Sequence, residues 1–387
     1  MRVGTERAQN GRIVPSWQFW SVSVDDVLGV WADWFTLWCT PGVGSRRLWP
    51  RLEASLSARS AMQALPQFAW RHEQGHAHAL AAFEWAQASP LRQLLFPSSP
   101  SYPKLWRQMP DPPLVLWAEG QLELLNRPTV ALVGARRCSP LGRQWTHRTA
   151  QQLSSVGISV VSGLASGIDA AAHEGALAGG GGTVALLGHG LDHCYPPQHG
   201  QLLGSVRQSG LALSEFAPSV PPVKHQFPMR NRLIAGLSHV VVVVEAMARS
   251  GSLITARSAL ELGREVMAVP GFPGSPLSDG PLQLLRDGAG LATDAADVLS
   301  CVSGALGSPL PLPGAASAPG PGDGAHAVTD PTQSALLNHL VVGESGLDEL
   351  VAVTGRPVHE ITDALFLLEM QGLVAAQAGD RWLRLAP

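Results

Sequence analysis

The chain has 387 residues, of which 45% are hydrophobic and 15% are charged. This composition excludes a wholly disordered protein, and domains of about 100 to 200 residues would divide such a chain into two or three. The net charge of −3 excludes a global basic field, although 25 of the 27 basic residues are arginines, which suit phosphate and which GC-rich codon usage would also produce.

The first fifteen residues contain no continuous apolar stretch of the kind that opens a secretory leader. We therefore expect a cytoplasmic protein without membrane insertion. The four cysteines lie far apart and form no CxxC pair, which predicts free thiols rather than a zinc or redox site. They are Cys39, Cys138, Cys194 and Cys301.

Residues 17–88 are rich in tryptophan and alanine at helical spacing, which predicts a small helical module. Within it the sequence TPGVGS, at residues 40–45, is typical of the tight turn of a helix-hairpin-helix, and Arg46 and Arg47 follow directly. A plain turn between two helices explains the same residues equally well.

The central region, residues 89–300 with its N-terminal extension, alternates short apolar runs with helical stretches. A parallel sheet buried on both faces produces this pattern, so we expect a Rossmann-like doubly wound α/β domain. The predicted strands are TVALV, ISVVSG, TVALLG, LALS, VVVVE and VMAVPG, with helices beginning at Pro140, at Ile168 and near Leu253.

Small and hydroxyl residues follow three of these strands, where a doubly wound sheet binds its ligands. The sequence FPMRNR, just before the VVVVE strand, adds guanidinium groups at a helix start. Together these residues predict a positive phosphate pocket. The predicted site consists of Gly134, Arg136, Ser162, Gly163, Arg230, Asn231, Arg232, Ser250, Gly251 and Ser252.

A structural role for the FPMRNR arginines is the alternative. Either Arg230 or Arg232 alone would brace the core by pairing with Asp169 or Glu245. If both instead hold phosphates, replacing them together lowers affinity for single strands and its salt dependence, and leaves thermal stability nearly unchanged.

Other chemistries are poorly supported. The chain has neither GxGxxG nor GxxxxGK[ST], so no nucleotide cofactor is expected. A metal at His189, His193, Cys194 and His199 would lack zinc-site spacing. A catalytic set of Ser162, His173 and Asp169 lacks the GxSxG elbow, and a capping Asp with a packed His explains these residues better.

Residues 301–330 are dominated by proline, glycine, alanine and serine, which predicts a linker. Beyond it, residues 331–387 have the pattern of a winged helix, with three helices and a small hairpin. Seven acidic residues and three arginines give this part a net charge of −4, which disfavours duplex DNA and favours contact with a protein.

On these residues the chain resembles the DprA/Smf family, DNA-processing proteins of bacterial natural transformation. The resemblance covers the central domain through VALVGARR, SGLASGIDAAAHEGAL, FPMRNRLIAGLS and VVEAMARSGSLITA, and extends loosely to both flanking modules. It implies a homodimeric, non-catalytic protein that binds and protects single-stranded DNA and helps load the RecA recombinase. By motif match, Arg136, Arg230 and Arg232 would hold phosphates, Ser162, Gly163 and residues 250–252 would shape the pocket, and Phe227 would stack a base or lie buried.

Three positions depart from the family pattern and put individual contacts in question. Ala135 stands where a hydroxyl residue is common. Pro197, Gln198 and His199 replace a frequent lysine, so that a phosphate contact is lost or passes to His199. Leu282 replaces a usual asparagine.

Two other functions compete with this reading. Nucleotide phosphoribohydrolases share a similar sheet, but their PGGxGTxxE motif is absent here, where SGSLITARSA stands. A duplex-binding regulator would use the winged helix, and the salt dependence of binding to single and double strands would distinguish it.

Overall fold

The computed structural model describes residues 24–307, 330–340, 344–370, 373–377 and 381–384. The chain forms two compact units, Met1–Gly314 and Ala315–Pro387. Helix α12 (Ala295–Leu306) occupies the first part of the predicted linker, so residues 301–306 are helical rather than irregular. Most of the remaining linker lies outside the described residues.

Four helices form the N-terminal module: α1 (Val24–Cys39), α2 (Ser45–Leu52), α3 (Ala58–Gln63) and α4 (His72–Gln87). Their core is continuous with one face of the central sheet, because Trp34, Phe35 and Leu48 belong to the same apolar cluster as Trp117 and Ala185. The module is therefore packed onto the sheet as part of the first unit.

A nine-stranded sheet forms the centre of this unit, in the order β1-β2-β6-β5-β4-β3-β7-β8-β9. The strands from β6 to β9 are parallel, and β1 and β2 add an antiparallel edge. The strands are β1 (Arg92–Leu95), β2 (Leu116–Gly120), β3 (Thr129–Val133), β4 (Ser159–Ser162), β5 (Thr183–Leu186), β6 (Leu211–Ser214), β7 (Val240–Val243), β8 (Glu265–Ala268) and β9 (Gly290–Leu291).

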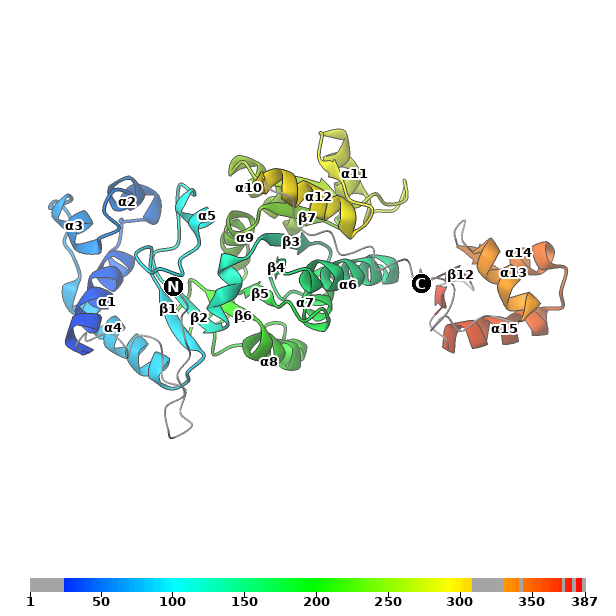
Figure 1. Ribbon diagram of the computed structural model, residues 1–387, viewed down its shortest axis with the longest axis horizontal. Coiled ribbons are helices and arrows are strands. Elements are labelled where there is room, and N and C mark those ends of the chain that lie inside the picture. The colour runs from blue at the N-terminus through cyan, green and yellow to red at the C-terminus, as the bar shows by residue number, and fades with distance from the viewer. Residues whose placement is uncertain (1–23, 308–329, 341–343, 371–372, 378–380, 385–387) are drawn as a thin grey trace. The chain divides into compact units, whose positions relative to one another are not determined.

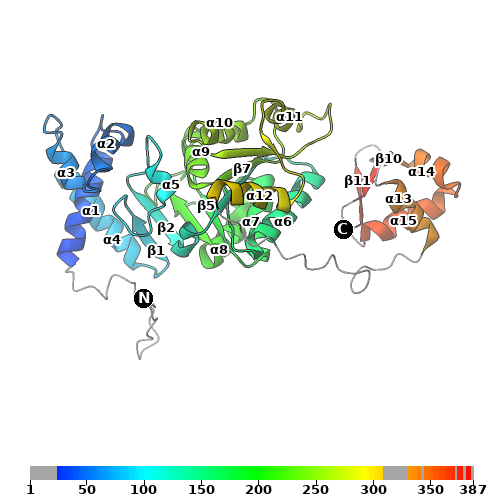
Figure 2. The same ribbon diagram turned by 45° about the horizontal axis from the view of Figure 1, so that its top comes forward.

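Helices cover both faces of the sheet (Figures 1 and 2). Ala131 and Val133 of β3 pack on the side of α9, whereas Val130 and Leu132 face Leu153 of α6. The uninterrupted apolar strands of the sequence follow from this double burial, which confirms the predicted fold class. One face carries α6 (Pro140–Ser155), α7 (Ile168–Ala178), α8 (Gly200–Ser209) and α12; the other carries α5 (Lys104–Arg107), α9 (Gln226–Leu237) and α10 (Gly251–Glu261).

From β3 the chain adds strands β4, β5 and β6 on one side, and it then returns to add β7 and β8 on the other side of β3. Strands β3 and β7 pair in parallel, with Val133 opposite Val243, and the chain leaves both of them at the same edge. A crevice opens where the strand order reverses in this way, because the connections on either side depart in opposite directions. The smaller elements of the unit are the 3₁₀ helices η2 (Leu122–Asn126) and η3 (Pro197–His199) and the helix α11 (Asp279–Arg286).

The second unit has a core of its own, in which Leu336, Leu350, Ile361 and Leu365 are fully buried. Three helices pack beside a small sheet of order β10-β12-β11, as expected of a winged helix. They are α13 (Pro331–His339), α14 (Leu347–Thr354) and α15 (Val358–Met370), with β10 (Ser345–Gly346), β11 (Val374–Gln377) and β12 (Arg381–Arg384). Across both units, no helix in the described ranges is long and apolar enough to cross a bilayer.

Candidate nucleic-acid interface

A cavity opens where β3, β4 and β7 end, and its volume of ≈ 660 Å³ lies within the range of about 300 to 1,000 Å³ typical of ligand pockets. Four cationic side chains line the cavity, and Asp169 is the one acidic residue in its wall. The cavity therefore has the positive balance that a phosphate ligand requires. The predicted site residues in its wall are Gly134, Arg136, Arg230, Asn231, Ser250, Gly251 and Ser252.

The N-terminus of α10 forms one wall. Ser250 caps this helix, since its Oγ accepts a hydrogen bond of 3.3 Å from the backbone N–H of Ser252 and lies 2.7 Å from the Ser252 hydroxyl. The first turn carries no acidic residue. The free N–H groups and the helix dipole therefore present positive potential to the cavity, which favours an anion.

Arg136 lies at the mouth of the cavity on the turn after β3, and its side chain is exposed. Its guanidinium carbon is 5.7 Å from the centre of the Phe227 ring, and that ring packs against Tyr195 at 5.4 Å. Phe227 is half-buried: part of its ring packs inside the protein, and part remains accessible to a base. A cation beside one ring of an aromatic pair at a cavity mouth suits a backbone phosphate with a stacked base next to it.

Arg230 forms the floor of the cavity and is only 4% exposed. Its Nη1 donates to the carbonyl oxygens of Gly163, at 2.6 Å, and of Leu186. Burial lowers the pKa of this guanidinium to about 10, and the charge of Asp169 counteracts that effect. A Cβ at Gly163 would displace the Arg230 guanidinium, so glycine at this position lets the side chain lie against the turn. Arg230 thus links the ends of β4 and β5 and contributes charge from below.

Asp169 and His173 belong to the support beneath this floor. Asp169 accepts backbone hydrogen bonds from Gly163 at 3.1 Å and Ala165 at 3.3 Å. Burial raises its pKa, while Arg230 and these donors lower it. His173 is fully buried and receives the backbone N–H of Leu164 on Nε2, and burial lowers its pKa to about 3. Both side chains hold the turn after β4. His173 is packed as expected, whereas Asp169 accepts from residues that precede α7 and does not cap this helix.

Arg232 is turned away from the cavity. Its Nη2 lies 2.6 Å from both carboxylate oxygens of Glu215, and its Nη1 lies 2.6 Å from the carbonyl oxygen of Asp111. Residues two apart on a helix point in different directions, so Arg230 and Arg232 cannot converge on one ligand. This corrects the prediction that both arginines complete the pocket. It also corrects the proposed bracing partner, which is Glu215 rather than Asp169 or Glu245.

Ser162 is another correction. It is completely buried, and its hydroxyl donates to the carbonyl oxygen of Leu132 at 2.7 Å, within the sheet. The hydroxyl therefore stabilises the β3–β4 pair and does not reach the cavity. Gly163 is not part of the cavity wall either: its carbonyl oxygen accepts from Arg230 and its N–H donates to Asp169. Asn231, in contrast, bridges from the cavity wall to α10, where its Nδ2 donates to the Gly251 carbonyl oxygen at 3.2 Å.

Among the wall residues that the predicted site lacks, Arg137, Lys224 and Tyr195 supply further cationic and aromatic groups. Lys224 is one of two lysines in the chain and precedes α9, which was a usable signal. Arg137 directly follows Arg136. His199, the alternative to the lysine of the family pattern, is not part of the cavity wall, and its Nδ1 lies 3.0 Å from the carbonyl oxygen of Leu164.

The residues considered for a metal are engaged elsewhere. Nδ1 of His189 lies 3.0 Å from the carbonyl oxygen of Gly190, and Nε2 of His193 lies 2.9 Å from that of Ser219. In the part of the chain that the structure describes, no three His, Cys, Asp or Glu residues are grouped to hold a metal ion.

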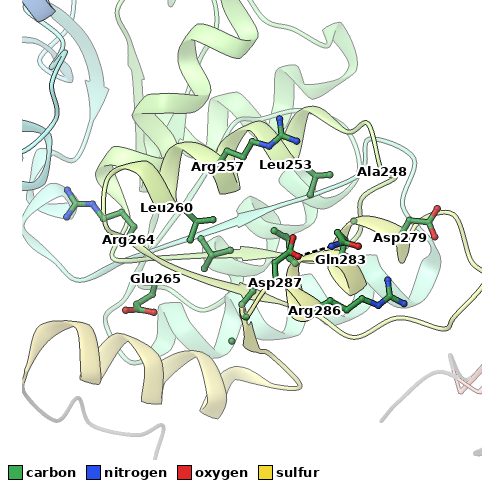
Figure 3. Close-up of a pocket in the computed structure, with 16 residues that line it drawn as sticks. Ala248, Leu253, Arg257, Leu260, Arg264, Glu265, Asp279, Gln283, Arg286 and Asp287 are labelled. Atoms are coloured by element: carbon green, nitrogen blue, oxygen red, sulfur yellow. Dashed lines mark hydrogen bonds between the residues drawn. The ribbon is translucent and has the colours of Figure 1, made fainter.

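A second cavity, of ≈ 550 Å³, lies between α10, α11 and β8 (Figure 3). Its three arginines, Arg257, Arg264 and Arg286, point in different directions, and Glu265, Asp279 and Asp287 balance their charge. The Asp287 carboxylate also accepts a hydrogen bond of 2.8 Å from Gln283. Because its charges balance, this second cavity is a poorer phosphate site than the first cavity, at the N-terminus of α10.

The family model described as DNA recombination-mediator protein A matches residues 93–303, and the DprA winged helix domain matches residues 316–380. Protein Smf of Escherichia coli is 40% identical over 293 residues, which cover 75% of this chain and 77% of that protein. The DNA processing protein DprA of Streptococcus pneumoniae is 46% identical over 51% of this chain and 70% of its own.

Two solved structures share this fold. The DNA processing protein A of Streptococcus pneumoniae aligns with a TM-score of 0.54 and 39% identity, covering 63% of this chain and 82% of that one. The protein from Helicobacter pylori aligns with a TM-score of 0.50 and 33% identity, covering 56% and 96%. The latter structure is described in terms of a unique single-stranded DNA binding mode.

Proposed function

Since the chain belongs to the family of DNA recombination-mediator protein A, we propose that it binds single-stranded DNA without regard to sequence and helps to load a RecA-type recombinase onto it during transformation and recombination. It would do so in the cytoplasm, as a homodimer and by binding rather than catalysis. The observation that carries the proposal is the positive cavity in which Arg136 and the N-terminus of α10 face the same space.

The site addresses the backbone of a nucleic acid. Guanidinium, ammonium and backbone N–H groups recognise phosphates, and phosphate contacts carry no sequence information. Phe227 and Tyr195 beside Arg136 add aromatic surface that any base can stack on. A single strand fits this arrangement because its bases are free to turn toward the rings.

The phosphoribohydrolase alternative requires a carboxylate that can take part in acid–base chemistry. Asp169 is the acidic residue of the cavity wall, and its carboxylate accepts two backbone N–H groups of the turn after β4. This engagement favours a binding role over hydrolysis.

Fluorescence anisotropy with a labelled oligothymidine and its duplex tests the proposal at two salt concentrations. We expect salt-sensitive binding that prefers the single strand and that Arg136→Ala weakens by about tenfold, as befits a charge-assisted hydrogen bond. The salt slope should also fall by about 0.7, because one phosphate contact is lost.

Arg143→Ala is the matched control. Arg143 is exposed on α6 and pairs with Glu174 at 2.5 Å, so its removal changes the charge equally without touching the cavity. Equal losses in both variants would show that net charge, rather than this site, determines binding. A wild-type protein that binds neither oligonucleotide would redirect attention to nucleotide ligands.

A further inference from the structure

Arginine and aromatic side chains also gather on the N-terminal module, away from the cavity. Arg46 and Arg47 are exposed on the first turn of α2, and Arg51 follows on its last turn. The guanidinium carbon of Arg47 lies 4.9 Å from the centre of the Phe68 ring, and Phe68 packs on Trp70 at 5.6 Å. We call Arg46, Arg47, Arg51, Phe68 and Trp70 the α2 surface.

The charge of this part of the chain differs from that of the whole. Residues 40–74 contain five arginines and two glutamates, a net charge of +3, whereas the whole chain has −3. Arg59 is paired with Asp33 at 3.0 Å and contributes little to the surface potential. The other four arginines form no ion pair with an acid within the described residues.

The loops around α2 hold these groups in place. The backbone N–H of Arg71 donates to Thr40 Oγ1 at 3.3 Å, which ties the segment after Trp70 to the turn before α2. In that turn, a side chain added at Gly42 or Gly44 would meet no atom within 4 Å, so the backbone there is open to a large ligand. Phe68 and Trp70 are half-exposed, and their rings are therefore only partly used by the core.

Two buried indole groups connect α2 with the helix that forms the cavity floor. Trp49 of α2 donates to the carbonyl oxygen of Arg107 at 3.1 Å, and Trp106 of α5 donates to that of Leu233 in α9 at 3.1 Å. In both views α2, α5 and α9 follow one another, and the exposed Lys104 lies on α5 between them (Figures 1 and 2). The α2 surface and the cavity are thus parts of one packed unit.

We propose that the α2 surface is a second contact for the same single strand of nucleic acid, which it holds by its phosphates and by stacking on Phe68 and Trp70. Cations interleaved with aromatic rings are how sequence-tolerant proteins track a single strand. The inference rests on the proposed function of the cavity. It extends the site from one pocket to a path, so that long strands gain affinity that short ones do not.

The test compares oligothymidines of increasing length on the full-length protein. For Arg46→Ala with Arg47→Ala we expect wild-type affinity for the shortest oligonucleotide that binds. On long ones the gain in affinity with length should be lost, and the salt slope should fall by about 1.4, which corresponds to two phosphate contacts on a single strand. Phe68→Ala should reduce the gain with length without changing the salt slope.

Arg59→Ala serves as the control on the same module, because Arg59 is paired with Asp33 and lies outside the α2 surface. If net charge alone determined the binding of long strands, Arg59→Ala would weaken that binding as well. Thermal melts of all variants guard against misfolding. Unchanged binding of long strands by the double variant, with the wild-type salt slope, would overturn the proposal. Its failure is distinct from failure of the cavity site, which would abolish binding of the shortest oligonucleotide as well.

Discussion

Arg230 and Arg232 show how two neighbouring arginines take different roles. Arg230 faces the cavity from below, whereas Arg232 is held by Glu215 on the other side of α9. Burial raises the pKa of Glu215, and Arg232 lowers it. The charge of Arg232 therefore stabilises the half-buried carboxylate of Glu215 rather than a ligand.

Arg232→Ala should consequently affect stability. Removing one partner of this half-buried ion pair leaves Glu215 without its charged hydrogen-bond donor, and we expect a loss of about 2 kcal/mol in the free energy of unfolding, measured by urea denaturation. Pairing Arg232→Met with Glu215→Leu should restore much of it. Single-strand affinity, measured below the melting transition, should stay near wild type. A stable Arg232→Ala variant with lost affinity would return Arg232 to the DNA site, as the sequence suggested.

His173 should make the first unit sensitive to mild acid. Its pKa is lowered to about 3 by burial, from 6.5, so the folded protein keeps it neutral while the unfolded chain protonates it below pH 6.5. The contribution of His173 to the free energy of unfolding is fully present above pH 6.5. As the pH is lowered from 6.5 to 3, this contribution falls by about 1.4 kcal/mol per pH unit.

His173→Gln removes this term, and urea denaturation at pH 7, 6 and 5 should give a flatter pH dependence for the variant than for the wild type. Asp169 and Glu215 act with the opposite sign, because their raised pKa values favour the folded state toward low pH. They are unchanged in the variant, so the difference between the two proteins isolates His173. Parallel curves would contradict its buried neutrality.

At the scale of elements, the N-terminus of α10 combines a structural cap with the proposed anion site. Ser250→Asp keeps a good N-cap and should leave the melting temperature unchanged. The added negative charge faces the cavity and should weaken oligothymidine binding by about tenfold or more, equivalent to about 1.5 kcal/mol. Ser250→Ala should instead cost about 1 kcal/mol of stability through the lost cap. Undiminished binding by Ser250→Asp would exclude the helix terminus from the site.

Among the elements, the strands and long helices were the most predictable from the sequence. Val240–Val243 is apolar throughout, and so is β3 after Thr129, because helices cover both faces, and this pattern needs no knowledge of partners. The end of α12 was missed because Ser303, Gly304 and Ala305 resemble a linker in composition. Packing of Val302 and Leu299 on the sheet extends the helix to Leu306.

At the scale of the whole molecule, the two units should be separable in function. The winged-helix unit is acidic, and its arginines are engaged: Arg356 with Glu360 at 3.1 Å, and Arg381 with Glu344 at 3.6 Å. Arg384 donates to the carbonyl oxygen of Leu337 at 3.0 Å. Because these arginines already have partners, they offer the phosphates of a duplex few free hydrogen-bond donors. This favours contact of the unit with a protein.

A truncated protein of residues 1–314 should therefore bind oligothymidine with the affinity and salt slope of the full chain. The separate unit of residues 315–387 should bind no duplex DNA in the same anisotropy assay, because its net charge repels the backbone. The duplex-binding regulator would be supported instead if residues 315–387 bound duplex DNA, or if the full chain bound a duplex and residues 1–314 did not.

By itself the sequence determined the six parallel strands from β3 to β8 and the edge at which glycine-rich turns gather, because hydrophobic periodicity and glycine-rich strand ends are local properties of the chain; β1, β2 and β9 were not predicted. Only the tertiary structure decided which polar groups reach the cavity. Ser162 and Arg232 have the right chemistry, but the sheet interior and Glu215 take their donors, and these partners come from distant segments. Lys224 and Tyr195 enter the site for the same reason: a side chain's partner depends on which distant elements packing brings beside it.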